Sequence, residues 1–264
     1  GFKADACHGS NPDLWPSEDP RCCDGEECLD ELQRILQKRH QEIAAVIIEP
    51  LMQGAAGMMC QPPGFLSKVK QLTQRFGTLL IADEVATGFG RTARMFACDH
   101  QAVDPDIMCL AKGLSGGYLP LAATLATDEI EQSFTGKLAD HRTLYHGHTY
   151  TGNSLACAAA NASLDLFETE PRLEQVRTIE AHLGQALEPC REMKGVVDVR
   201  VLGAIGVVEL ETIADMNGLR ARFIDAGCWI RPFGNIVYLM PAFTIGEDDL
   251  ARLCDAVVRV VGEH

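Results

Sequence analysis

The sequence has few basic residues, few aromatic residues and no long apolar run. Its 264 residues include 23 Lys and Arg against 37 Asp and Glu, which gives a formal net charge of −14, and only 6% are aromatic. This negative charge repels nucleic-acid backbones and anionic lipid surfaces. No apolar run approaches the roughly 20 residues that span a bilayer, and residues 1–10 lack the layout of a secretory signal. We therefore expect a soluble, cytoplasmic protein that acts on small molecules.

Paired cysteine spacing is also lacking. The sequence has 11 cysteines but no CxxC pair of the kind that binds zinc, and several cysteines, such as Cys109 and Cys157, lie inside apolar segments. We expect these to be reduced thiols in the core and predict no bound metal. One group near the start leaves a metal site open as an alternative to a surface loop: Cys7, His8, Cys22, Cys23 and Cys28.

Helix-like and strand-like segments alternate along the first part of the chain. An apolar stripe predicts a helix over residues 28–40, and a second amphipathic segment predicts another over 64–77. Short apolar runs predict strands at 44–50, 78–85, 105–113 and 118–127. This alternation is typical of an α/β fold with a mainly parallel sheet and flanking helices. Ligands of such sheets gather beyond the carboxyl ends of the strands.

The last third of the chain has a different character. Its patterns predict helices at 171–194, 216–227 and 247–262, and strands within 196–210 and 228–241. We expect these segments to form a compact α+β unit. A helical segment before Pro171 can join the two units without a flexible linker, so we place the domains at 1–165 and 166–264.

Two ionisable residues stand at the ends of apolar strands. Asp83 closes one of them, and Lys112 closes the next. A carboxylate in such a place can keep a heterocyclic nitrogen protonated, while a partly desolvated lysine suits Schiff-base chemistry. Either residue alone is more often an ordinary solvated side chain. Together they suit the two ends of one aromatic cofactor.

Four segments in chain order resemble the signature blocks of class III aminotransferases: IIEPLMQGAAGM, LLIADEVATGFGRT, PDIMCLAKGLSGGYLPLAA and LYHGHTYTGNSLACAAA. The resemblance implies the type I pyridoxal-phosphate transferase fold, with pyridoxal 5'-phosphate as the cofactor. It implies that Lys112 carries the cofactor as the catalytic residue and that Asp83 pairs with the pyridine nitrogen. Val85 is implied to pack against the ring.

The same resemblance implies further binding residues. In the family the HGxT segment crosses the interface of a homodimer, which maps Gly147 to the substrate and His148 and Thr149 to the cofactor phosphate; a polar turn is the alternative. Arg231 resembles the arginine that binds the substrate carboxylate, with a surface arginine as the alternative. No role is assigned to three other ionisable residues of these motifs, Glu49, Glu84 and Arg91.

The tail of the chain narrows the resemblance. LGAIGVVEL and GCWIRPFGNIVYLMPAF resemble the branch of the class that aminates 8-amino-7-oxononanoate to 7,8-diaminononanoate in biotin biosynthesis, with S-adenosylmethionine or lysine as amino donor. An aminotransferase for ω-amino acids or ornithine stays an alternative, because one fold serves many substrates. The resemblance covers most of residues 44–264. The long N-terminal segment of the class has no counterpart in this sequence, so a non-catalytic remnant is a further alternative.

Overall fold

The computed structural model describes residues 25–137 and 140–264. Cys7, His8, Cys22 and Cys23 lie outside these ranges, so the possible metal group near the start is not described. Within them, no cluster of His, Cys, Asp or Glu could hold a metal ion. None of the helices in these ranges has the length and apolar content to cross a membrane.

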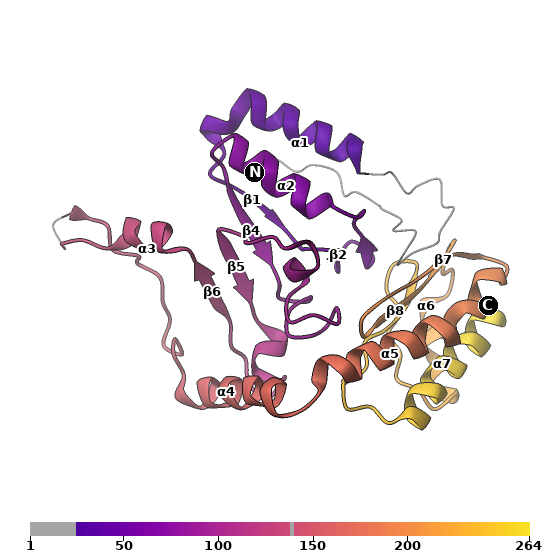
Figure 1. Ribbon diagram of the computed structural model, residues 1–264. Helices are drawn as coiled ribbons and strands as arrows, with labels where there is room; N and C mark the ends of the chain where they lie inside the picture. The colour runs from indigo at the N-terminus through magenta and orange to yellow at the C-terminus, as the bar shows by residue number, and fades with distance from the viewer. Residues whose placement is uncertain (1–24, 138–139) are drawn as a thin grey trace.

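A four-stranded sheet forms the centre of the first unit (Figure 1). Strands β1 (Ala45–Ile48), β4 (Leu79–Asp83) and β5 (Ile107–Leu110) are parallel neighbours, and β6 (Ala123–Ala126) pairs antiparallel with β5 at the edge. The prediction of a mainly parallel sheet is confirmed. All three parallel strands therefore end at the same edge, which is where ligands of such sheets bind.

Two helices cover one face of this sheet. Helices α1 (Glu26–Arg39) and α2 (Phe65–Arg75) bury Leu29 and Leu66 in one cluster with Leu80 of the sheet, which is fully buried. Residues of the opposite face alternate with these because successive side chains of a strand point to opposite sides. On that face Ile47 is 64% exposed. The flanking helices predicted from the sequence thus lie on one face within the described part of the chain.

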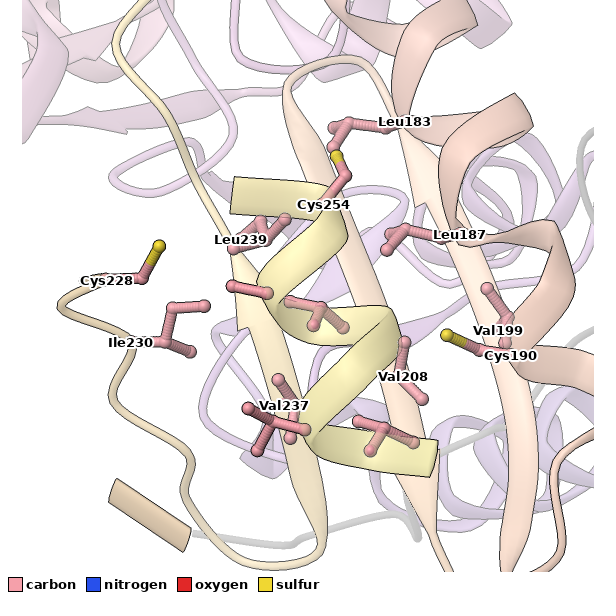
Figure 2. Packing of buried hydrophobic residues seen from close by; sticks show 14 of the residues in the cluster. Leu183, Leu187, Cys190, Val199, Val208, Cys228, Ile230, Val237, Leu239 and Cys254 are labelled. Carbon is pink, nitrogen blue, oxygen red and sulfur yellow. The ribbon is translucent and has the colours of Figure 1, made fainter. Parts of the chain in front are cut away.

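A second unit follows, built from an antiparallel sheet and helices. It contains β7 (Val196–Leu202), β8 (Ile205–Leu210), β9 (Ile236–Leu239), α5 (Arg172–Leu187), α6 (Met216–Asp225) and α7 (Glu247–Gly262). Figure 2 shows side chains of α5 and of the sheet, among them Leu187 and Val208, gathered around α7. Helix α7 spans the segment predicted from its apolar stripe, which confirms that prediction.

Helix α4 (Ser154–Thr169) joins the two units. It begins at Asn153, whose side-chain oxygen accepts hydrogen bonds from the backbone of Leu155 and Ala156, and it ends before Pro171, which precedes α5. The helical segment predicted before Pro171 is confirmed. The division of the domains at 165/166 stays a prediction. The remaining elements are η1 (His40–Glu42), β2 (Met52–Gln53), β3 (Met59–Cys60), η2 (Ala97–Gln101), η3 (Lys112–Ser115), α3 (Asp128–Phe134) and η5 (Glu188–Glu192).

The strands are shorter than the sequence suggested, and two of the differences affect candidate site residues. The third parallel strand ends at Leu110, so Lys112 lies two residues beyond it, at the start of η3. The strand pair expected over 228–241 was wrong: only Ile236–Leu239 is a strand. Pro232 has no backbone N–H for a sheet, and Gly234, with φ of 56°, lies in a turn that pairs Phe233 with Ile236.

The short hairpin β2–β3 was not predicted, and it joins the two units. Its Met52 and Cys60 are buried against Leu202, Ile205 and Val207 of the second unit. The hairpin leaves the carboxyl end of β1, so this contact places the second unit beside the edge of the sheet where the parallel strands end.

Two neighbouring residues of α6 test how much the core of the second unit contributes to the stability of the protein. We expect Phe223→Ala to lower the free energy of unfolding by about 3–5 kcal/mol, because Phe223 is fully buried and its removal leaves a cavity. Its neighbour Ile224 is 53% exposed, so Ile224→Ala should change the free energy of unfolding by less than about 0.5 kcal/mol. Urea unfolding monitored by circular dichroism measures both variants. Equal losses would contradict the packing described.

Candidate active site

Asp83 stands at the carboxyl end of β4, on the sheet face that α1 and α2 leave open. It lies opposite Cys109 of β5 in register, and burial, then the negative charge of Asp83, raises the pKa of the Cys109 thiol. The Asp83 Oδ1 atom accepts a hydrogen bond from the backbone N–H of Val85 at 3.0 Å. Among the described residues nothing donates to Oδ2, so half of this carboxylate can receive a proton donor from a ligand.

Lys112 follows the adjacent strand, and its backbone is held in an unusual conformation. Its φ is 43°, in the left-handed region that residues other than glycine seldom adopt. Such strain persists where neighbouring contacts enforce it, and it concentrates at functional sites. The side chain is exposed and forms no ion pair or hydrogen bond with any described residue, Asp83 included. Two opposite charges thus lie at the carboxyl ends of neighbouring strands, at one edge of the sheet, without contacting each other.

The residues after Lys112 are packed from two sides. A Cβ atom added to Gly113 would lie 2.9 Å from Cβ of Phe89, so the backbone there needs a glycine. From α4, the Ser163 hydroxyl donates to the carbonyl of Gly113 at 3.3 Å. Leu114 and Ser115 are buried behind it. These contacts fix the backbone that carries the lysine, and neither Ser163 nor Phe89 was singled out from the sequence.

Glu84 points away from the open face and organises the loop after β4. It is fully buried, and its carboxylate accepts hydrogen bonds from the Thr87 hydroxyl at 2.5 Å and from the backbone N–H of Cys98 at 2.8 Å. Burial, followed by the charge of Glu84, raises the pKa of the Cys98 thiol. With both carboxylate oxygens engaged inside the protein, Glu84 is a structural residue.

Arg91 fastens that loop to the second unit. Its Nη1 atom donates to the carbonyls of Ala204 at 3.1 Å and Pro241 at 2.9 Å, and its guanidinium lies 4.6 Å from the ring centroid of Phe243. Burial lowers the pKa of Arg91 to about 10. Gly203 permits the approach, because a Cβ atom there would lie 2.3 Å from the carbonyl oxygen of Arg91. Arg91 therefore links the units and is not a solvated loop residue.

The segment around Gly147, His148 and Thr149 lies apart from Asp83 and Lys112. All three residues are exposed, and the turn is closed locally by a hydrogen bond from the backbone of His148 to the Thr151 hydroxyl at 2.9 Å. Figure 1 shows this stretch between α3 and α4 at the outer side of β6. Within the described ranges, no hydrogen bond or apolar cluster connects it with either residue of the sheet edge.

Arg231 lies in the irregular segment before β9. Its side chain is exposed and binds no other described residue. Two residues later, Phe233 packs against the cluster that holds the β2–β3 hairpin. Arg231 thus comes from a segment that contacts the loop at the end of β1. The structure gives no direct contact between Arg231 and the edge of the sheet.

Comparison with known proteins identifies the family to which the chain belongs. A family model described as aminotransferase class-III matches residues 12–261. The chain belongs to the class III aminotransferase family, which uses pyridoxal phosphate. This confirms the family inferred from the four sequence segments.

Its relatives include two proteins named adenosylmethionine-8-amino-7-oxononanoate aminotransferase. The one from Nitratidesulfovibrio vulgaris is 45% identical over 93% of this chain and 48% of that protein, and the one from Geobacter sulfurreducens is 43% identical over 92% and 56%. The crystal structure of the Methanocaldococcus jannaschii protein of the same name matches with a TM-score of 0.85 at 38% identity, over 92% of this chain and 59% of that one. The predicted fold is confirmed. The chain spans about half the length of the curated relatives it matches.

Arg91 can be tested against a neighbouring arginine. We expect Arg91→Ala to lower the free energy of unfolding by about 2–4 kcal/mol, because it removes two charge-assisted hydrogen bonds and a ring contact between the units. Arg94→Ala is the control, since Arg94 is exposed and makes one long hydrogen bond, 3.3 Å, to Asp99. Urea unfolding of both variants checks this. A loss no larger for Arg91 than for Arg94 would refute the link.

Proposed function

We propose that the full-length protein carrying this chain is a pyridoxal-phosphate-dependent aminotransferase that transfers an amino group to 8-amino-7-oxononanoate, giving 7,8-diaminononanoate. The proposal rests mainly on one observation: the carboxylate of Asp83 and the amine of Lys112 share the carboxyl edge of the sheet with no bond between them. The substrate is argued from the names of relatives that are 40–45% identical. A cytoplasmic location stays a prediction.

The described residues fit the cofactor. Oδ2 of Asp83 has no donor in the described ranges and suits a protonated ring nitrogen, while the exposed amine of Lys112 suits the aldehyde carbon at the other end of the ring. Val85 is half-buried, and its N–H orients the Asp83 carboxylate. Its side chain would pack against the ring. Pyridoxal phosphate supplies the electron sink that makes the substrate's amino-bearing carbon acidic.

Lys112 and Asp83 would divide the proton chemistry. Asp83 keeps the proton on the ring nitrogen, because an adjacent carboxylate favours the charged form of a heterocycle. Lys112 would hold the cofactor covalently, and as a free amine it would move a proton at the substrate's amino-bearing carbon. The left-handed backbone at Lys112, held by Gly113 and Ser163, keeps this amine at the edge of the sheet.

His148 and Thr149 would bind the cofactor phosphate of a second copy of the chain. Their exposure and separation from Asp83 of the same chain support this arrangement, in which Gly147 lies beside the partner's substrate. A hydroxyl and backbone N–H groups suit a phosphate. A homodimer is therefore part of the proposal.

Arg231 would bind the carboxylate of 8-amino-7-oxononanoate. Its guanidinium is exposed and has no partner among the described residues, and a planar fork of donors suits a carboxylate. The amino donor, S-adenosylmethionine or lysine, would use the same site, with Lys112 again moving the proton, because both half-reactions use one cofactor.

Lys112→Ala tests the central assignment. We expect this variant of the full-length protein to lose the visible absorbance band of lysine-bound cofactor and to transaminate more than about 100-fold more slowly, because the proton-transfer group is gone. Borohydride reduction of the wild-type protein, followed by peptide mass spectrometry, should place the cofactor on the peptide containing Lys112. A covalent adduct on another lysine, or an unchanged band in the variant, would sink the proposal.

Arg231→Ala tests substrate binding separately. We expect KM for 8-amino-7-oxononanoate to rise about 10- to 100-fold with the absorbance of the bound cofactor unchanged, because only the carboxylate contact is lost. Arg252→Ala is the control, since Arg252 is an exposed arginine paired with Asp249 on α7. Steady-state kinetics with the keto substrate and with simple ω-amino acids measure both variants. An unchanged KM in Arg231→Ala would show that Arg231 does not bind the substrate.

A further inference from the structure

Arg200 of β7 is a buried arginine that the proposed chemistry does not use. It is 5% exposed and lies between two carboxylates: its Nη1 atom donates to Asp198 Oδ2 at 2.8 Å and to Glu209 Oε2 at 2.6 Å. A buried guanidinium is tolerated only when its charge is paired and its donors are satisfied. The two carboxylates provide the negative charge that balances the guanidinium. Because both bind Nη1, the Nε and Nη2 atoms of Arg200 can donate to other acceptors.

These remaining donors cross to the first unit. Arg200 Nε donates to the carbonyl of Met58 at 2.9 Å, and Nη2 donates to the carbonyl of Gly57 at 2.8 Å. Both carbonyls belong to the turn of the β2–β3 hairpin, which starts at the carboxyl end of β1. Met58 has φ of 54°, a left-handed conformation that a residue other than glycine adopts at some cost. The two hydrogen bonds hold the turn in that conformation.

The turn is also tied to the edge of the sheet that carries Asp83. Glu49 follows β1, and its Oε2 atom accepts a hydrogen bond from the backbone N–H of Gly54 at 2.9 Å. Ile48, the last residue of β1, pairs with Ala82 in register, so Glu49 and Asp83 are the residues that follow this pair on neighbouring strands. A continuous set of contacts therefore runs from Arg200 through the turn at 54–58 to the neighbour of Asp83.

We propose that Arg200 is a positioning residue, which sets the place of the turn at 54–58 beside the edge of the sheet and thereby shapes the substrate side of the site. The expected effect on KM rests on the proposed function, whereas the expected effect on the turn at 54–58 does not. In the turn, Ala55 and Ala56 are exposed and small, so on this proposal the turn would border the site without filling it. A displaced turn would alter substrate binding and leave the cofactor's attachment at Lys112 intact.

The chain offers a matched control in Arg191 of η5. Arg191 also pairs with Asp198, at 3.5 Å, and donates to the carbonyl of Val199, but its bonds stay within the second unit. Arg191→Lys therefore disturbs the same buried carboxylate without touching the turn. Arg200→Lys keeps the positive charge between Asp198 and Glu209, but a single ammonium cannot also reach both carbonyls. Any difference between the two variants reports on the crossing hydrogen bonds.

Hydrogen–deuterium exchange of the full-length protein tests the structural part. We expect Arg200→Lys to speed amide exchange in the peptide covering 52–61 about tenfold, which is the effect of losing one charge-assisted hydrogen bond, with the β7 and β8 peptides unchanged. Arg191→Lys should leave 52–61 at the wild-type rate. Unchanged exchange at 52–61 in Arg200→Lys, or equal effects of both variants, would overturn the proposal.

Kinetics test the functional part. We expect Arg200→Lys to raise KM for 8-amino-7-oxononanoate about tenfold, with kcat and the absorbance of the bound cofactor near wild-type values. A change in kcat alone or loss of the cofactor band would overturn the positioning role. If the wild-type protein neither binds the cofactor nor transaminates, the proposed function fails, while the exchange experiment still decides the role of Arg200.

A substitution in the turn itself tests the same proposal if Arg200→Lys folds poorly. Gly57 has φ of 104°, so Gly57→Ala strains the turn without altering β7. It should reproduce the faster exchange at 52–61 and the higher KM. Gly77→Ala is its control, because Gly77 has a positive φ of 65° and open space around it, at the end of α2. Equal behaviour of the two glycine variants at 52–61 would contradict the proposal.

Discussion

The parallel pairing of β4 with β5 is the constraint on which the site depends. It sets Asp83 opposite Cys109 and brings Lys112, two residues past the end of β5, to the same edge of the sheet. Parallel strands end together, so two residues 29 positions apart in sequence come to flank one ligand.

Arginines hold the second unit against this edge from both directions. Arg91 reaches from the first unit to the carbonyls of Ala204 and Pro241, and Arg200 reaches from the second unit to those of Gly57 and Met58. Each guanidinium binds backbone carbonyl oxygens, which remain whatever side chains the accepting residues carry. The contacts between the units at these points therefore depend on the two arginines. Met52 and Cys60 of the hairpin β2–β3 are buried against Leu202, Ile205 and Val207, so an apolar cluster spans the boundary between the units.

Much of the fold could be predicted because the signals are local. The apolar runs of β1, β4 and β5 and the stripes of α1, α2 and α7 lie close to their predicted positions. The β2–β3 hairpin was missed since two-residue strands have no measurable period, and residues 228–235 were taken for a strand although Pro232 and Gly234 favour a turn. Asp83 and Lys112 were singled out from strand ends and motifs, while Phe89, Ser163 and Arg200 carried no local signal.

The sequence by itself determined the alternation of elements, the strand ends that carry Asp83 and Lys112, and the family, because these depend on neighbouring residues and on ordered motifs. Only the tertiary structure decided what Arg91, Glu84 and Arg200 do. In sequence each is an ordinary charged residue. Their roles come from carbonyls, amides and hydroxyls that folding brings to them, in the case of Arg200 from more than 140 positions away. Hydrogen-bond partners at such separations leave no trace in composition or periodicity.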